Sequence, residues 1–228
     1  MSTLVKISDF LAYATPHALR SKDVLPYDKQ IPAADQWGYI MGYYGRIAPK
    51  SNRWYPRRCF DCNGLAEGFY LDKTGININT FSRTNYSTWC KGYNSTDMSK
   101  MPQIPGTAVF VYGNYAGLQI VHHVAYLWKK YGPGPKDWLI VQASGSSIGV
   151  IISRLGSGFN RWGLMKMYFD YDVPPVAPEA KHYHVVHGDS WARIARVNGI
   201  TKAQLKAKNS IPPNPDRSLI IGETLLLP

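Results

Sequence analysis

The amino-acid sequence predicts an α+β protein with an antiparallel sheet, followed by a small βααβ module. Apolar residues recur at helical spacing in the first part of the chain. From Thr107 onward the pattern changes to short apolar runs, rich in Val and Ile, that are typical of strands. A proline-rich segment then separates a short tail from the rest. Helices that precede a run of strands indicate an α+β domain.

Four helices are expected before the strands begin. They cover residues 4–14, 33–45, 63–75 and 80–92. In the third helix Leu65 and Phe69 are four residues apart, so they share one face, and Gly75 follows as a helix stop. The first helix is predicted from apolar residues at helical spacing in "LVKISDFLAYA".

Five strands are expected after the helices. They cover residues 107–112, 119–127, 138–144, 148–153 and 163–169. Each segment combines apolar residues with β-branched or aromatic side chains, which favour extended backbone. The sequence therefore predicts one antiparallel sheet built from consecutive strands.

The prolines of residues 173–181 predict a semi-rigid linker between a domain of residues 1–172 and a tail of residues 182–228. The tail has the pattern strand, helix, helix, strand. We expect its strands at 183–189 and 223–228 and its helices at 190–199 and 201–209. Asp189 or Ser190 is expected to cap the first of these helices, and Gly199 to end it.

The charge of the chain indicates an anionic partner. Lys and Arg number 26 against 15 Asp and Glu, which gives a formal net charge of +11. No dense basic tract is present, so a nucleic-acid partner is not expected. The N-terminal segment lacks the uninterrupted apolar stretch of a secretory signal, and no run approaches the ~18 apolar residues of a membrane span. We therefore expect synthesis in the cytoplasm without membrane insertion.

Cys59 and Cys62 form a Cys-x-x-Cys pair, and Cys90 is the third cysteine of the chain. A zinc site would need a fourth ligand such as His122 or His123, because one such pair is only half a site. A redox pair would need the motif after a strand in a βαβ unit, which the pattern does not show. Neither a metal nor a cofactor is expected.

The third interpretation makes Cys62 a nucleophile at the start of a helix, where unpaired N–H groups and the helix dipole favour a thiolate. The same N–H groups could hold an oxyanion. A base is then needed, and His122 and His123 lie together on a predicted strand whose alternation points them to opposite faces. Gln142, in an otherwise apolar strand, would orient that base. Each of these residues also has a purely structural interpretation.

The order of these motifs resembles the NlpC-type family of papain-like cell-wall peptidases. The segments that carry the resemblance are "FDCNGLAEGFY", "PGTAVFVY", "HHVAYLW" and "VQASGSSIGVIIS", within residues 37–153. The resemblance implies a papain-like N-terminal domain with Cys62 as nucleophile, His123 as base and Gln142 as the orienting residue. It also implies that Asp61, which could instead only cap the helix, helps to bind the free amine of the substrate.

The chain departs from this family at several positions. Asn63 stands where Ser is usual, Thr107 where Asp is usual, and Ala125 where Gly is usual. The Tyr-x-Trp-Gly-Gly element that precedes the cysteine in the family is replaced by the longer "NRWYPRR". Trp54 and Tyr55 of this segment are predicted to line the substrate groove.

The tail resembles a LysM module, a βααβ fold that binds glycans containing N-acetylglucosamine. The residues that carry this resemblance are "YHVVHGDSWARIARVNGITKAQLKAKNSI" and "LIIGETLLLP". The resemblance implies that the glycan lies between two loops. The implied glycan-binding residues are Gly188, Asp189, Ser190, Trp191, Ser210, Ile211 and Pro212. Trp191 stands where Leu is usual, and it could serve only as core.

Together the two resemblances imply a peptidoglycan hydrolase of the D-glutamyl–diamino acid endopeptidase type. It would use a Cys-His-Gln mechanism on bacterial peptidoglycan while the LysM module anchors it to the wall. Two alternatives stay open: an N-acetylmuramoyl-L-alanine amidase with the same site, and a catalytically inactive wall-binding protein. A monomer or weak oligomer is expected. Lytic activity without a signal peptide suggests a phage endolysin that reaches the wall after release from the cell.

Overall fold

The computed structural model describes residues 3–24, 29–172, 181–209 and 218–227. The chain forms two compact units. The first comprises residues 1–131 and 135–177, and the second includes residues 178–228. Most of the predicted linker, residues 173–180, lies outside the described residues. None of the helices in the described part of the chain has the length and apolar content needed to span a bilayer.

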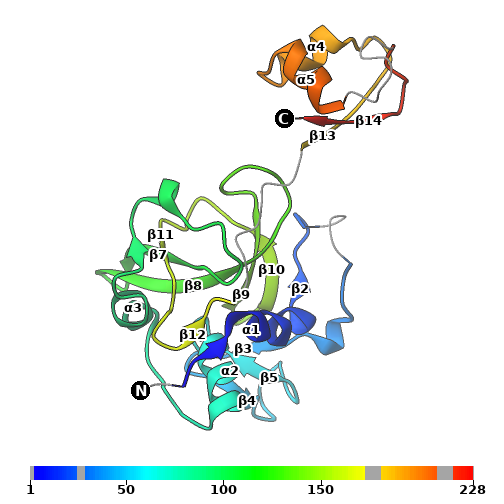
Figure 1. The fold of residues 1–228 in the computed structure, drawn as a ribbon. Coiled ribbons are helices and arrows are strands. Elements are labelled where there is room, and N and C mark those ends of the chain that lie inside the picture. Colours follow the sequence, from blue (N-terminus) through cyan, green and yellow to red (C-terminus); the bar gives the residue numbers. More distant parts are fainter. Residues whose placement is uncertain (1–2, 25–28, 173–180, 210–217, 228) are drawn as a thin grey trace. The chain divides into compact units, whose positions relative to one another are not determined.

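A seven-stranded sheet is the centre of the first unit (Figure 1). Its order is β2 (Leu19–Arg20), β10 (Gly149–Arg154), β9 (Trp138–Gly145), β8 (Leu118–Lys130), β7 (Ala108–Tyr115), β11 (Arg161–Gly163) and β6 (Asn94–Ser95). All neighbours pair antiparallel except β2 and β10, which pair parallel. The first four predicted strands are confirmed as β7 to β10, and the mixed α+β class is confirmed with them.

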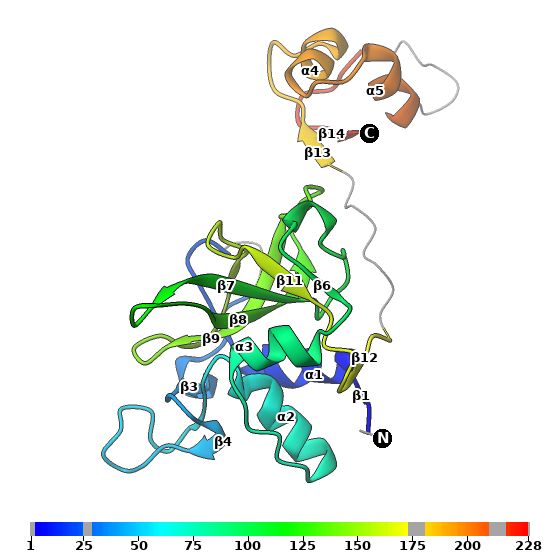
Figure 2. The same ribbon diagram turned by 90° about the vertical axis from the view of Figure 1, so that its left-hand side faces the viewer.

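Two helices lie on the same side of this sheet (Figure 2). They are α1 (Ile7–Ala14) and α2 (Gly64–Thr74), as the sequence predicts. Phe10 of α1 and Phe69 of α2 are fully buried against each other, with ring centroids 5.6 Å apart. Phe10 also meets Tyr126 of β8 edge to face at 4.7 Å. Through these contacts Phe10 joins α1 to both α2 and β8 in the core.

Gly75 ends α2 as predicted, because it adopts the left-handed conformation with φ 73° and its N–H bonds to the Leu71 carbonyl. The fourth predicted helix is present as α3 (Ser82–Thr84), which continues into a π-helical turn, η3 (Asn85–Trp89). Short 3₁₀ turns lie at η1 (Thr15–His17) and η4 (Met98–Lys100).

The predicted helix at 33–45 is wrong. This segment forms a 3₁₀ turn, η2 (Ala33–Asp35), then β3 (Gly38–Tyr39) and β4 (Tyr44–Ile47), which flank β5 (Arg58–Phe60) in a small sheet. Gly42 and Gly45 take φ values of 78° and 105°, which an α-helix does not contain. The aromatic residues of the segment favour strands as readily as helices.

The predicted strand at 163–169 is also wrong as a single element. β11 ends at Gly163, and the chain turns before β12 (Phe169–Asp170), which pairs parallel with β1 (Val5–Lys6). Leu164 and Met165 are both buried, whereas Lys166 and Met167 are both exposed. Burial in adjacent pairs does not match the alternation of a strand, so apolar content alone misleads here.

The second unit has the predicted βααβ order. β13 (Lys181–His184) pairs antiparallel with β14 (Thr224–Leu227), and α4 (Trp191–Val197) and α5 (Lys202–Asn209) lie between them in sequence. Ser190 caps α4 by accepting the N–H of Arg193, and Gly199 follows α4 with φ 67°. The small core of the unit contains Val185, Ile194, Ala195, Leu205, Leu225 and Leu227.

Candidate active site and glycan-binding module

Cys62 lies in the tight turn that joins β5 to α2, two residues before the helix begins. Asp61 fixes this turn. Its Oδ1 accepts the N–H groups of Asn63 at 3.0 Å and Gly64 at 2.6 Å, and its Oδ2 accepts the Gly42 N–H at 2.7 Å. Asp61 therefore caps α2, and it also lines a cavity beside Cys62. The N–H groups of Asn63 and Gly64, which we expected to hold an oxyanion, already bind this carboxylate.

Gly64 is required at the start of α2 by the packing of the backbone. A Cβ there would overlap the carbonyl oxygen of Tyr43. Gly68, one turn later, approaches the Tyr44 carbonyl oxygen in the same way. The two glycines let α2 lie directly against the chain around Tyr43, and this contact holds the Cys62 turn in place.

A β-bulge brings both histidines toward Cys62. Val111 of β7 pairs with His123, but the next residue, Tyr112, pairs with Val121, so His122 is the extra residue in β8. His122, His123 and Cys62 all line one cavity of about 410 Å³. The expectation that strand alternation separates the two histidines is therefore wrong, because the bulge interrupts the alternation.

His123 is held by Gln142 across the sheet. The ring Nε2 lies 2.7 Å from Gln142 Oε1, while Gln142 Nε2 donates to Ser153 Oγ at 2.9 Å. Because the amide of Gln142 donates to Ser153, its oxygen faces the ring and accepts from Nε2–H. This tautomer leaves Nδ1 as the basic nitrogen. Burial lowers the pKa of His123, against the opposing effect of the Gln142 hydrogen bond, so the ring is neutral near pH 7.

Replacing Gln142 by alanine should lower the rate of any reaction that uses His123 as base, because the ring loses its acceptor and its fixed tautomer. We expect a loss of roughly 10- to 100-fold in kcat with KM little changed. The measurement is kcat and KM over pH for wild type, Gln142→Ala and Gln142→Asn. The control is Ser153→Ala, which removes only the outer partner of the amide. Equal kcat in wild type and Gln142→Ala would contradict the orienting function.

The thiol of Cys62 is protonated in the folded protein. Burial, with the Asp61 carboxylate adding to it, raises its pKa to about 12. Arg57 and Arg58, which precede Cys62 by a few residues, make other contacts. Arg58 pairs with Asp72 at 2.8 Å instead, and the guanidinium of Arg57 lies over the Trp54 ring. The helix N-terminus therefore does not supply a thiolate before the reaction begins. A base must remove the thiol proton during the reaction.

Three cavities that share lining residues follow one another along the first unit. The first holds Cys62, His123, Gln142, Ser144 and Phe159. It shares Met41, Cys62, Tyr115 and His122 with a second cavity of about 250 Å³, which also contains Asp61 and Phe81. Arg83 and Val121 are common to the second cavity and a third. Cys62 thus lies where the first two cavities join.

Tyr39 is a residue of this site that the sequence did not indicate. It lines the cavity with Cys62 and His123, and burial, with Cys62 and Asp61 contributing, raises its pKa. The sequence did not single out Tyr39 because other tyrosines, such as Tyr43 and Tyr44, lie close to it in the same segment. Tyr39 reaches the cavity because it lies in β3, whereas the sequence pattern predicted a helix over this segment.

A buried polar cluster supports the back of the Cys62 turn. Glu67 of α2 is 3% exposed, and its Oε1 accepts from Asn63 Nδ2 at 2.6 Å and from Thr80 N and Oγ1 at 2.5 and 2.9 Å. Asn85 Nδ2 donates in turn to Asn63 Oδ1. Asn63 thus links the start of α2 to η3. Burial raises the pKa of Glu67 to about 7, despite the hydrogen bonds from Thr80.

The Glu67 carboxyl should make the stability of the first unit depend on pH. The folded state holds this proton more tightly than the unfolded chain, so the stabilising effect is complete below pH 4.5 and disappears as pH rises through 7. The group should remove about 3 kcal/mol of unfolding free energy over that range. Glu67→Gln keeps an acceptor oxygen but cannot ionise. Urea unfolding from pH 4.5 to 8 should show a smaller decline for Glu67→Gln, and parallel pH curves for both proteins would contradict this assignment.

The structure does not bring Trp54 and Tyr55 to the cavities around Cys62. Trp54 is 5% exposed, and its indole Nε1 donates to the Ser146 carbonyl at 2.8 Å. It packs against Cys59 in a small separate core cluster. Tyr55 is exposed and lines a different cavity, together with His17 and Arg57. The prediction that these two residues line the Cys62 groove is therefore wrong, because Trp54 serves packing.

The other cysteines are buried thiols. Cys59 packs with Trp54, and Cys90 belongs to the main core cluster. Within the described residues no three His, Cys, Asp or Glu side chains gather as metal ligands. Cys59 and Cys62 thus face different surroundings in spite of their spacing.

In the second unit the predicted glycan-binding residues have strong structural contacts. Asp189 Oδ2 accepts from Tyr183 OH and Val186 N, both at 2.9 Å, and so holds the loop between β13 and α4. Gly188 of this loop has φ 85°. Trp191 packs against the small core of the unit. Ser210, Ile211 and Pro212 lie outside the described residues.

The second unit is a small βααβ module by its fold. Residues 183–228 match the LysM domain family, so this part of the chain is a LysM domain. LysM domains bind peptidoglycan and related glycans, which indicates a cell-wall partner. No curated protein matches the chain.

Proposed function

We propose that the chain is a cysteine-type peptidoglycan hydrolase of the NlpC type, with a papain-like first unit. The observation that carries the proposal is the arrangement around one cavity. Cys62 and His123 line it together, and the His123 ring is held through Nε2 by Gln142. Nucleophile, base and orienting amide are the three groups that thiol-dependent acyl transfer requires.

The reaction begins when His123 Nδ1 removes the proton of the Cys62 thiol while sulfur attacks the carbonyl carbon of a stem-peptide amide. The C–N bond breaks as His123 returns the proton to the leaving amine. Water then attacks the thioester, His123 takes a proton from it, and the carboxylic acid leaves as Cys62 regains its proton. The neutral thiol and neutral imidazole of the resting site suit this sequence, because both protons stay within the pair.

The LysM domain supplies the anchor in this proposal. Its glycan binding keeps the first unit at high local concentration beside the stem peptides. The net charge of +11 favours an anionic wall. The anchor and the lytic site together suggest an endolysin-type enzyme that is made in the cytoplasm and reaches the wall when the cell membrane is opened.

The bond that is cut decides between the two enzymatic alternatives. Purified walls from several Gram-positive bacteria are digested with the whole chain, and the soluble fragments are analysed by mass spectrometry. An endopeptidase of the proposed type produces a new free amine on the diamino acid of the stem peptide. Release of intact stem peptides would instead assign the amidase. Failure to release any fragment would favour the inactive wall-binding protein.

A further inference from the structure

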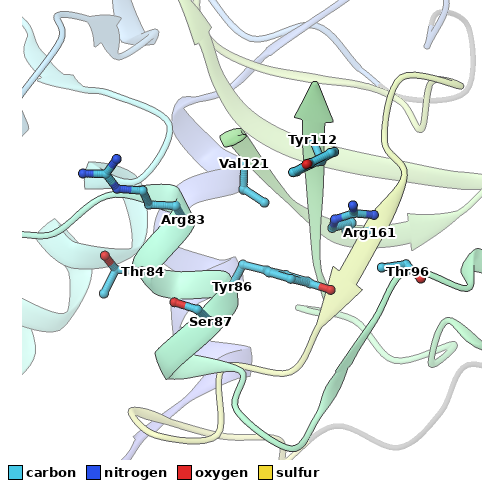
Figure 3. A pocket seen from close by; sticks show the side chains of 8 residues that line it. All are labelled: Arg83, Thr84, Tyr86, Ser87, Thr96, Tyr112, Val121 and Arg161. Carbon is cyan, nitrogen blue, oxygen red and sulfur yellow. The ribbon is translucent and has the colours of Figure 1, made fainter. Parts of the chain in front are cut away.

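The third cavity has a lining that differs from the rest of the groove. It measures about 550 Å³ and is bounded by the helical segment α3–η3, β7 and β11. Its lining residues are Arg83, Thr84, Tyr86, Ser87, Thr96, Tyr112, Val121 and Arg161. Figure 3 shows Tyr86, Tyr112 and Arg161 gathered on one side of this cavity, whereas Arg83 lies on the other side and its guanidinium points away from Arg161. Two arginines, two phenols and three hydroxyls thus surround it.

The charge of this lining is positive and uncompensated. No carboxylate is among the lining residues. Arg161 contacts the Tyr112 ring at 4.1 Å and donates one long bond of 3.5 Å to the Asn160 carbonyl. Arg83 lies over the Phe81 ring at 5.2 Å. In the described part of the chain neither arginine has an acidic partner. Most of their N–H donors are therefore available to a ligand.

The position of Arg161 is fixed by its neighbour. The side chain of Asn160 donates to the Tyr112 carbonyl at 2.8 Å and accepts the Tyr112 N–H at 3.0 Å. These two bonds hold the start of β11 to β7 at the edge of the cavity. Arg161 is half-buried, so its guanidinium is partly shielded from water and a hydrogen bond to an anion gains strength there.

This cavity continues the groove that contains Cys62. Arg83 and Val121 line both the third cavity and the second, and the second contains Cys62. A peptide that places its scissile bond at Cys62 would extend along α3 past Arg83 and reach Arg161. The proposed peptide substrate carries free carboxylates, which are the natural partners of an arginine without an acidic neighbour.

We propose that the cavity between α3–η3, β7 and β11 is a subsite for a carboxylate of an acidic peptide substrate, held by Arg161, with Arg83 at the junction with the second cavity. Tyr112 supports the Arg161 guanidinium, Tyr86 borders the cavity, and the hydroxyls of Thr84, Ser87 and Thr96 complete a polar lining. The inference rests on the proposed function, because it names the part of that substrate which the far end of the groove would recognise.

The test uses a synthetic tetrapeptide of stem type, containing D-glutamate and lysine, and the same peptide with its carboxyl groups amidated. Arg161→Gln should lower kcat/KM for the free acid by roughly 10- to 100-fold and leave the amidated peptide nearly unaffected. Arg83→Gln, at an exposed position, should cause a smaller loss for the free acid without affecting folding. The control is Arg46→Gln, which removes another arginine that lies over a tyrosine ring but lines none of the three cavities.

A binding measurement separates this inference from the proposed function. The whole chain with Cys62→Ala is titrated with both peptides, with and without Arg161→Gln. Selective loss of affinity for the free acid would support the subsite even if the wild-type chain hydrolyses nothing. Equal affinity for both peptides, or an equal loss for both in Arg161→Gln, would overturn the subsite even if hydrolysis is fast.

Discussion

Replacing Cys62 by alanine should abolish hydrolysis of cell walls and leave wall binding unchanged. The thiol is the group that forms the covalent intermediate, and the described cavity contains no second nucleophilic thiol to replace it. Loss of the nucleophile of a catalytic triad lowers kcat on the order of 10⁴- to 10⁶-fold. The measurement is dye release from labelled walls, with sedimentation of the chain on the same walls to measure binding.

Two controls sharpen this prediction. Cys90→Ala removes a buried core thiol and should retain activity on walls, after allowance for its stability. Binding by the Cys62→Ala chain should equal that of wild type, because the LysM domain is a separate unit. A Cys62→Ala chain that releases dye at the wild-type rate would show that Cys62 is not the nucleophile.

Replacing Gly64 by alanine should destabilise the first unit severely. The added Cβ would meet the backbone carbonyl of Tyr43, which cannot move aside as a flexible side chain can. Overpacking of a well-packed interior costs about 1–3 kcal/mol, and a clash with backbone belongs at the upper end of that range. Denaturant unfolding, followed by tryptophan fluorescence, would measure the shift of the midpoint.

The matched control is Gly156→Ala. A Cβ at Gly156 meets nothing within 4 Å, and its φ is not in the left-handed region. This variant should unfold within about 0.5 kcal/mol of wild type. Equal stability of Gly64→Ala and Gly156→Ala would contradict the packing of α2 against Tyr43 and the geometry of the Cys62 turn that depends on it.

Local patterns predicted the elements whose periodicity and end signals agree. α2 was predictable because Leu65 and Phe69 share a face and Gly75 stops the helix. The first four strands followed from continuous apolar runs. The helix predicted at 33–45 was wrong because the aromatic residues of this segment fit a helix and a strand equally well. The φ values of Gly42 and Gly45, which exclude a helix, become visible only in the structure. The single strand predicted at 163–169 was wrong because the apolar residues of this segment are buried in adjacent positions and do not alternate.

Pairwise geometry was the part of the site that the sequence could not supply. The order of Cys62, His123 and Gln142 along the chain suggested a shared purpose, and the structure brings His123 and Gln142 within 2.7 Å. The bulge at His122 depends on the register between β7 and β8, which no local pattern encodes. Glu67 and Thr80 are likewise joined only by the packing of α2 against a distant loop.

The raised pKa of Cys62 changes the picture of how the site would work. A helix start alone suggests a thiolate that exists before substrate binds, but burial and the Asp61 cap favour the neutral thiol. Asp61 thus serves the geometry of the turn at an electrostatic cost to the thiolate. A neutral thiol needs a base to remove its proton, and His123 is the residue proposed for this.

Chemical modification of Cys62 tests directly whether its thiol is the nucleophile of wall hydrolysis. The native chain is alkylated with iodoacetamide for increasing times, and each sample is assayed for dye release and for the modified fraction of each cysteine by peptide mass spectrometry. Cys59 and Cys90 are fully buried, so Cys62 should react first. The rate of wall hydrolysis should fall in proportion to Cys62 modification and reach zero when that modification is complete. Full activity with Cys62 completely alkylated, or no hydrolysis by the unmodified chain, would contradict this prediction.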